Sequence, residues 1–474
     1  MRDLDIRISP FQFIQLLKCD LYCSVNQHAK AYVEAIISAD DEDAYVEMAL
    51  EEIVAEISCT DDAGEDVTLL KGLVTDLSID SRNGLKQLNL TIRSATVLMD
   101  LVEYTRTYQN PGFTMSNILD SIGYYPDYNY VMSVGTSAPV EDMIVQYKET
   151  DWEFIKRMAS RYNSVVLPDY VNGKPWFHFG LPAAKKPHEI NDVFYQMHRR
   201  MSMKFEDKAS NRVAAVQEKD AIYYRIEDRE IYRLGDAVAF KGRELRVYSI
   251  ESHLEGQELV HHYVLKTGAG FGIKQQFNEK MIGASLEGYV INVANDLVQV
   301  QLNVDTVLNQ SGARWLAFST VYSSPDGSGW YAMPELGDCI RLYLPTEHEN
   351  EAYVVSSVNL QATDGVSRTD PSRKSIKNIN GKEILLTATQ IILTNNQADQ
   401  GNDVTVILDD AEGIHIRCDK DITITSKETV SIQSKESDLG ISAQNQVEIS
   451  DGNGGKIELN EIGLALKGKE VQVQ

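Results

Sequence analysis

The sequence is poor in cysteine and in long apolar runs, and each shortage excludes a class of protein. Its 474 residues include five cysteines and no C-x-x-C pair, so neither a disulfide framework nor a structural zinc site is expected. No stretch approaches the ~18 consecutive apolar residues that a membrane helix needs. The first residues, MRDLDIRISPF, lack the basic and apolar regions of a secretion signal. We therefore expect a protein that folds in the cytoplasm.

Positive charge is also scarce. Lys and Arg number 45 against 70 Asp and Glu, which gives a formal net charge of −25. A chain this acidic is a poor partner for phosphate backbones and for anionic lipid, so sequence-specific nucleic-acid binding is not expected. The hydrophobic content of 43% and charged content of 24% are ordinary for globular proteins. The length suits two to four domains.

The strongest pattern lies near the C-terminus. From residue 412 onward, pairs of apolar residues two positions apart recur every seven to ten residues, separated by Asp, Lys, Ser, Asn and Gly. Spacing by two marks strands with one apolar face, and the polar residues between them favour bends. The pairs are Ile414/Ile416, Ile422/Ile424, Val430/Ile432, Leu439/Ile441, Val447/Ile449, Ile457/Leu459, Leu464/Leu466 and Val471/Val473.

This repeat is too short for one chain to enclose its own core. A single-chain β-helix needs about 20 residues per coil, whereas each repeat here supplies one strand and one bend. Three intertwined chains, each forming one side of a prism, would bury the apolar face, and we prefer this trimeric β-helix or β-prism to an antiparallel meander. The predicted trimer core comprises Ile414, Ile416, Ile422, Ile424, Val430, Ile432, Val447, Ile449, Ile457 and Leu459.

Upstream of the repeat, residues 283–360 predict a small barrel. Strand-like segments cover Glu287–Asn303 (with a turn at Asn295-Asp296), Trp315–Thr320, Cys339–Leu344 and Ala352–Val358. Five short strands in so few residues suggest a closed, OB-type barrel. Residues 364–380 are expected to be a linker, and residues 381–474 the trimeric spike.

Residues 1–275 mix strand and helix signals. Ser94–Tyr108 has the apolar spacing of an amphipathic helix, and Thr114–Ile122 fits a second, shorter one. Thr150 and Glu153 form a capping box ahead of a helical apolar stripe. Strand periodicity returns over Leu234–Leu265 with a turn at Lys241-Gly242. The predicted fold class is mainly β with minor α, in which two barrel-like subdomains with a helical insert precede the OB-type barrel and the spike.

Four stretches resemble one known group of proteins. Gln146–Ala159 (QYKETDWEFIKRMA) is similar to the hallmark stretch of the VgrG and phage late-control D families, which are hub proteins of contractile tails and type VI-like injection machines. Ser94–Ile122, Leu234–Val238 and Gly329–Leu344 (GWYAMPELGDCIRLYL) resemble further segments of the same families, in the same order.

The resemblance implies a structural role without enzymatic activity. Such a protein would form a homotrimer below the inner tube, contact the tube and baseplate proteins, and point its spike at the target envelope. It would fold in the bacterial cytoplasm and join a tail-like particle. No His-x-His occurs at the end of the sequence, so no tip metal is expected. We instead expect a separate PAAR-like tip protein on Val471, Val473 and Gln474.

Searches for chemistry give no site, and we predict no catalytic residue, cofactor or metal. No P-loop occurs, and His348-Glu349 lacks the second histidine of a zinc-protease motif. His261 and His262 are adjacent in a predicted strand and should face opposite sides. Gly268–Gly272 is expected to be a linker, and the pairs Asp61-Asp62 and Asp409-Asp410 are expected to be acidic turns. His415 should point outward or toward an edge of the trimer.

Two other functions compete with the spike. A trimeric tailspike that degrades polysaccharide or binds a receptor would need aromatic side chains on its helix face, but the sequence after Gly381 contains no Trp, Tyr or Phe. A surface adhesin would need an export signal or anchor, which we do not find. The sequence does not separate a phage from a headless bacteriocin (tailocin) or a type VI-like system.

Overall fold

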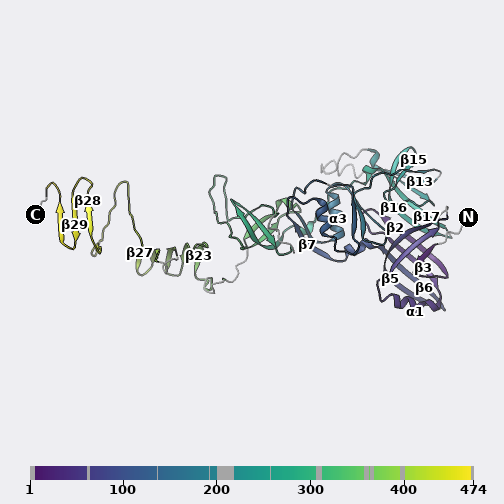
Figure 1. The fold of residues 1–474 in the computed structure, drawn as a ribbon, viewed down its shortest axis with the longest axis horizontal. Coiled ribbons are helices and arrows are strands. Elements are labelled where there is room, and N and C mark those ends of the chain that lie inside the picture. Colours follow the sequence, from purple (N-terminus) through teal and green to yellow (C-terminus); the bar gives the residue numbers. More distant parts are fainter. Residues whose placement is uncertain are drawn as a thin grey trace. The chain divides into compact units, whose positions relative to one another are not determined.

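The computed structural model describes residues 6–60, 64–135, 137–191, 193–199, 218–256, 258–305, 312–356, 362, 368–395 and 401–470. The chain divides into two compact units, Met1–Leu360 and Gln361–Gln474 (Figure 1). Strands dominate both units and the helices are short, which confirms the predicted mainly-β class. The hub and barrel predicted as separate domains lie together in the first unit.

One twelve-stranded sheet forms most of the hub. Its main path runs β1-β4-β5-β6-β3-β2-β16-β17-β14-β13, and β15 joins β12 to β16. The strands are β1 (Arg7–Ser9), β2 (Gln15–Ser24), β3 (Lys30–Ile37), β4 (Val54–Thr60), β5 (Asp66–Arg82), β6 (Leu85–Ser94), β12 (His188–Ile190), β13 (Phe194–Arg199), β14 (Ile222–Asp228), β15 (Ala237–Phe240), β16 (Arg243–Glu255) and β17 (Glu258–Lys266). Three short helices accompany them: η1 (Ala39–Asp41), α1 (Glu42–Met48) and η3 (Glu218–Ala221).

The two halves of this sheet are joined through β2 and β16. These strands pair antiparallel, with Ser249 opposite Ser24, and a single hydrophobic core runs under both halves. In β3 every second residue is buried, as expected for a strand with one apolar face. The predicted turn at Lys241-Gly242 is present, with φ of +51° and +69°, the positive values that tight hairpin turns require. The predicted subdomains therefore share one sheet and one core.

A mixed insert between β6 and β12 has its own core. It contains two small sheets, β7 with β9 and β10-β11-β8, packed with two α-helices. Its elements are η2 (Ala95–Asp100), β7 (Glu103–Tyr108), α2 (Met115–Ser121), β8 (Asn129–Met132), β9 (Ile144–Thr150), α3 (Asp151–Ser160), β10 (Val166–Pro168) and β11 (Trp176–Phe179). The short helix predicted over Thr114–Ile122 is confirmed as α2, capped by Thr114.

The long helix predicted over Ser94–Tyr108 is wrong. Only the short 3-10 helix η2 forms there, and the chain then enters β7, which pairs with β9. Leu101 and Val102, which belonged to the predicted apolar stripe, are 67% and 52% exposed. The apolar spacing of this segment fits a strand as well as a helix. Pairing with β9 satisfies the backbone hydrogen-bonding groups of β7, and this tertiary contact decides in favour of the strand.

The barrel follows two 3-10 turns, η4 (Gly268–Phe271) and η5 (Glu279–Met281). Its strand order is β20-β19-β18-β21-β22. A parallel bridge between Phe318 and Val354, with Ser319 N donating to Val354 O at 2.7 Å, closes the sheet. The elements are β18 (Ala284–Ala294), β19 (Leu297–Leu302), β20 (Leu316–Ala317), β21 (Cys339–Leu344), η6 (Glu349–Glu351) and β22 (Tyr353–Ser356).

The second unit consists of two antiparallel meanders, β23-β24-β25-β26-β27 and β28-β29-β30. The strands are β23 (Lys374–Lys377), β24 (Glu383–Leu386), β25 (Gln390–Thr394), β26 (Val404–Asp409), β27 (Gly413–Cys418), β28 (Val447–Ser450), β29 (Lys456–Asn460) and β30 (Gly463–Lys467). Strand structure therefore begins inside the segment predicted as a linker. The argument that one chain would not form a meander was wrong for these strands, because neighbouring segments do pair with each other.

The middle of the repeat behaves differently. No strand is assigned anywhere in residues 419–446, all of which the structure describes. The predicted strands at Ile422/Ile424, Val430/Ile432 and Leu439/Ile441 thus have no strand partner within the described part of the same chain. The intertwined trimeric arrangement stays a prediction.

Candidate functional site

Helix α3 begins at the predicted capping box. The hydroxyl of Thr150 accepts from Glu153 N at 3.1 Å, and the Glu153 carboxylate accepts from Thr150 N at 3.2 Å. The Thr150 hydroxyl also donates to Asp100, at the end of η2. The reciprocal bonds satisfy backbone groups that a helix start leaves unpaired, and the bond to Asp100 joins the start of α3 to η2 within the insert.

The first residue of α3, Asp151, is fully buried and surrounded by donors. Its carboxylate accepts from Gln146 Nε2 at 2.9 Å and from the hydroxyls of Tyr125, at 2.8 Å, and Tyr124. Arg106 Nη1 lies 3.3 Å away. Burial lowers the pKa of Arg106, but the charge of Asp151 and the contributions of Tyr108 and Tyr124 together outweigh burial and raise it. A buried carboxylate with this many partners holds together α3, β7 and the loop between α2 and β8, which carries Tyr124 and Tyr125.

Arg157, one turn before the end of α3, lies between two buried carboxylates. Its guanidinium contacts both oxygens of Glu149 at 2.8 Å, Glu349 Oε1 at 2.9 Å and Val145 O at 2.6 Å. The exposed fractions of the three charged side chains are only 5–8%. Burial lowers the pKa of Arg157, but the charges and hydrogen bonds of Glu149 and Glu349 outweigh burial and raise it. Because Glu349 belongs to η6, the helix is bonded directly to the barrel.

Other contacts reinforce this connection. Asp305, which follows β19, accepts from Thr107 N at 2.7 Å and from the Thr107 hydroxyl at 2.5 Å. Burial raises the pKa of Asp305, against the opposing effect of these hydrogen bonds. Met143 and Val145, from the start of β9, are part of the barrel's hydrophobic core. We call this set of contacts the helix–barrel junction: Arg157, Glu149, Glu349, Thr107, Asp305, Met143 and Val145.

Sequence reasoning missed the role of Glu349, which it treated only as part of an incomplete zinc motif. The sequence did contain an indication of this role, in its partner Arg157. Arg157 lies within the helical stripe of Phe154, Ile155 and Met158, which are all completely buried. An arginine on a buried face requires an acidic partner, although the sequence does not say which one.

The predicted spike residues are not buried within this chain. Nine of the ten predicted core residues are exposed, from 41% at Ile457 to 71% at Ile414 and Ile424, and Val447 is half-buried. The predicted tip residues Val471, Val473 and Gln474 lie outside the described residues. A single copy thus leaves an apolar surface of regular spacing open to water, which marks an interaction surface.

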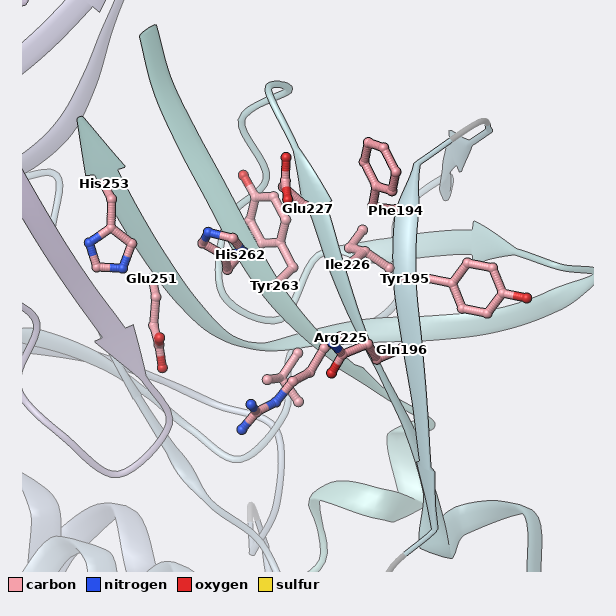
Figure 2. Close-up of a pocket in the computed structure, with 11 residues that line it drawn as sticks. Phe194, Tyr195, Gln196, Arg225, Ile226, Glu227, Glu251, His253, His262 and Tyr263 are labelled. Atoms are coloured by element: carbon pink, nitrogen blue, oxygen red, sulfur yellow. The ribbon is translucent and has the colours of Figure 1, made fainter. Parts of the chain in front are cut away.

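A groove lies on one face of the hub sheet, where β13, β14, β17 and β16 run side by side (Figure 2). Its volume is about 490 Å³, and its ionisable lining residues are Arg225, Glu227, Glu251, His253 and His262. His253 Nδ1 hydrogen-bonds Asp20 Oδ1 at 2.9 Å, and the rings of His253 and His262 are 5.8 Å apart. The groove is therefore lined by both ionisable and apolar side chains, and no cysteine or serine is among them.

The other chemical candidates take structural roles. His261 faces the opposite side of β17 from His262, as predicted; it is buried and shares a 2.7 Å hydrogen bond with Ser252. Burial lowers its pKa to about 4. Asp409 accepts from the backbone of a turn, at 2.8 Å from Ala411 N, and His415 is exposed. Gly268–Phe271 forms η4, whereas Asp61-Asp62 lies outside the described residues.

Among the residues that the structure describes, no cluster of three or more His, Cys, Asp or Glu side chains could hold a metal ion. Within the same residues, no helix has the length and apolar character needed to cross a membrane. The predicted absence of enzymatic activity stays a prediction.

Comparison with known proteins identifies the hub. Residues 34–167 match the family model of the phage tail baseplate hub (GPD). The VgrG of a Francisella PdpA–VgrG complex is similar, at TM-score 0.58 and 9% identity, over 88% of this chain and 81% of that one. The E. coli c3393 protein, described as a type VI secretion component with structural similarity to the T4 tail proteins gp27 and gp5, is similar at TM-score 0.51 and 10% identity.

The c3393 match covers 74% of this chain and 99% of that protein. At such low identity both structural matches speak for the fold alone. No curated protein sequence matches the chain. The matched residues 34–167 include α3 up to and beyond Arg157, so the family region contains the helix side of the helix–barrel junction. Residues 34–167 therefore form a region that is similar to the phage tail baseplate hub (GPD) family, in agreement with the resemblance of the sequence.

Proposed function

We propose that this protein is the central hub and spike of a contractile injection machine, whether phage tail, tailocin or type VI-like. Three copies form the hub that caps the inner tube and contacts baseplate proteins. The five-stranded barrel serves as an OB-type connector, and the C-terminal unit forms the spike that pierces the target envelope. The protein folds in the bacterial cytoplasm before it joins the particle, and it performs no catalysis.

The observation that carries this proposal is the exposed apolar repeat of residues 412–466. Its side chains alternate as in strands, yet between Cys418 and Val447 they have neither a strand partner nor a core in their own chain. Burial of one such side chain contributes about 1.5–3 kcal/mol. Three copies winding around one axis would bury these side chains, whereas in a single copy the six between Cys418 and Val447 keep exposed fractions of 51–71%.

The helix–barrel junction supports a mechanical role. A hub that is pushed by a tube must pass axial force into the barrel without the two parts separating. Arg157 is bonded to Glu149 of β9 and to Glu349 of the barrel inside a buried site. A buried ion pair with satisfied hydrogen bonds is costly to break, because separation leaves a charge unpaired away from water.

The tip of the spike needs a cover. Strand edges and an apolar core at the end of a prism are exposed to aggregation unless another protein caps them. A PAAR-like tip protein on Val471, Val473 and Gln474 remains our proposal for that cover. A carbohydrate-cleaving tailspike is not favoured, because the sequence after Gly381 has no aromatic residue for sugar stacking.

The native mass of the full-length chain tests the trimer. We expect three copies for the wild type and one for the double variant Ile422→Asp/Ile424→Asp, which places charges on the predicted core face. Thr423→Asp adds a charge to the opposite face and should remain trimeric. A wild-type mass of one or two copies would rule out this function. Electron microscopy of particles assembled with and without the protein tests its place at the tube end.

A further inference from the structure

The barrel carries a projecting hairpin between β20 and β21, residues 319–338, which we call the finger. Its two arms are bonded to each other: Trp330 N donates to Tyr322 O at 3.0 Å and Ser324 N donates to Ser328 O at 2.9 Å. The Thr320 hydroxyl donates to Trp330 O at 2.6 Å. These contacts give the finger a fixed hairpin shape.

Two further features hold the finger rigid. Gly329 has φ of +145°, and a Cβ at this position would lie 2.6 Å from Tyr322 O, so only glycine lets the arms approach. The Tyr331 hydroxyl donates to Asn295 O at 2.8 Å, in the turn between β18 and β19. The finger is thus anchored to the barrel and cannot fold its side chains inward without breaking these bonds.

This rigid hairpin presents large apolar side chains to water. The exposed residues are Val321, Tyr322, Trp330, Tyr331 and Leu336, and the exposed fractions of Trp330 and Tyr331 are 53% and 76%. Tyrosine and tryptophan are the side chains that most often dominate the binding energy of protein interfaces. Their pre-ordered arrangement lowers the entropy that a partner must overcome.

We propose that the finger packs against the barrel of a second copy of this chain, forming a ring of three contacts. This inference rests on the proposed trimer. The same finger on each copy meets a different surface on its neighbour, and such head-to-tail contacts close into a ring under threefold symmetry. Outside the finger, the described residues just before β18 and β20 include two more exposed large apolar side chains that can receive it, Ile282 and Trp315.

Chain length favours a second copy as the partner, and the charge of the finger disfavours a lipid surface. The chain between Ser356 and Lys374 reaches at most ~60 Å when fully extended, so the barrels of copies that are joined through their second units stay within reach of one another. The finger contains Asp326, Glu335 and Asp338 but no Lys or Arg. This charge disfavours an anionic lipid surface as its partner.

Hydroxyl-radical footprinting of the purified full-length chain tests the contact. We expect Trp330 and Tyr331 to be oxidised roughly tenfold more slowly in the trimer than in the monomeric Ile422→Asp/Ile424→Asp variant. Tyr124, 51% exposed on the hub, serves as a reference that we expect to be unchanged. Because only copies of this chain are present, protection reports a second copy. Protection that requires added tube protein would overturn the proposal.

A variant gives an independent readout. Trp330→Ala/Tyr331→Ala should raise the concentration at which the trimer dissociates by roughly tenfold or more. Leu50→Ala/Leu85→Ala, which removes two exposed apolar side chains from the hub, should leave it unchanged. If the wild type is a trimer but Trp330 is oxidised as fast as in the monomeric variant, the finger contact is wrong and the spike trimer stands. A monomeric wild type overturns both proposals.

Discussion

Arg157 and Glu349 form a buried ion pair at 2.9 Å although 192 residues separate them in the sequence. The pair joins the helix of the family's hallmark stretch to the barrel that follows the hub. Arg161 extends the network, at 3.7 Å from Glu349 and 3.5 Å from Asp142. The hub and the barrel are therefore held together by a charge network in addition to the shared apolar contacts of Met143 and Val145.

Replacing Arg157 with Met should destabilise the first unit by about 3–5 kcal/mol, because Glu149 and Glu349 would remain buried without their partner. Guanidinium unfolding of the full-length chain measures this loss. Arg229→Met removes an exposed ion pair with Glu258, at 3.0 Å, and should cost far less, because water screens exposed charges. Equal losses of stability in the two variants would show that Arg157 contributes no more to folding than an exposed ion pair does.

Loss of the helix cap should have a smaller effect. Thr150→Ala removes the acceptor for Glu153 N and the donor to Asp100, and we expect a cost of about 1–2 kcal/mol. Thr150→Ser keeps the hydroxyl and should stay close to the wild type. Thermal unfolding followed by circular dichroism distinguishes them, and the idea fails if serine is as damaging as alanine.

His261 should make the stability of the hub depend on pH. Its folded pKa is about 4, lowered by burial, against an ordinary value of 6.5. The unfolded chain therefore binds a proton more readily between these values, so stability is complete above about pH 6.5 and declines as the pH falls toward 4, by about 3 kcal/mol in total. The variant His261→Gln should lose this part of the dependence. Unfolding midpoints at pH 7.5 and pH 5 measure it, and an unchanged slope in the variant would contradict the assignment.

The spike should be kinetically stable as a trimer. Interwound chains cannot separate without breaking contacts to both neighbours, so we expect the wild type to run as a trimer in SDS gels without boiling. Ile414→Asp should abolish that resistance, because it charges the predicted core face. His415→Asp changes the neighbouring residue on the opposite face and should preserve it. Loss of resistance in both variants would contradict a core that lies on one face only.

Local features were predictable where they depend on neighbouring residues. The Thr150–Glu153 box, the Lys241-Gly242 turn and strand Cys339–Leu344 all follow from short-range patterns, and the structure confirms them. Ser94–Tyr108 was mispredicted because its apolar spacing suits either a helix or a strand. Pairing of β7 with β9, far along the chain, decides between them.

The sequence by itself determined the mainly-β class, the starts of α2 and α3 and the repeat whose apolar face one copy leaves exposed. Propensity, capping and periodicity act between residues that are close in the chain. Only the tertiary structure decided that β2 pairs with β16, that the barrel closes through Phe318 and Val354, and that Arg157 meets Glu349. These contacts depend on how distant segments share one core and satisfy buried charge, and no local pattern specifies which segments those will be.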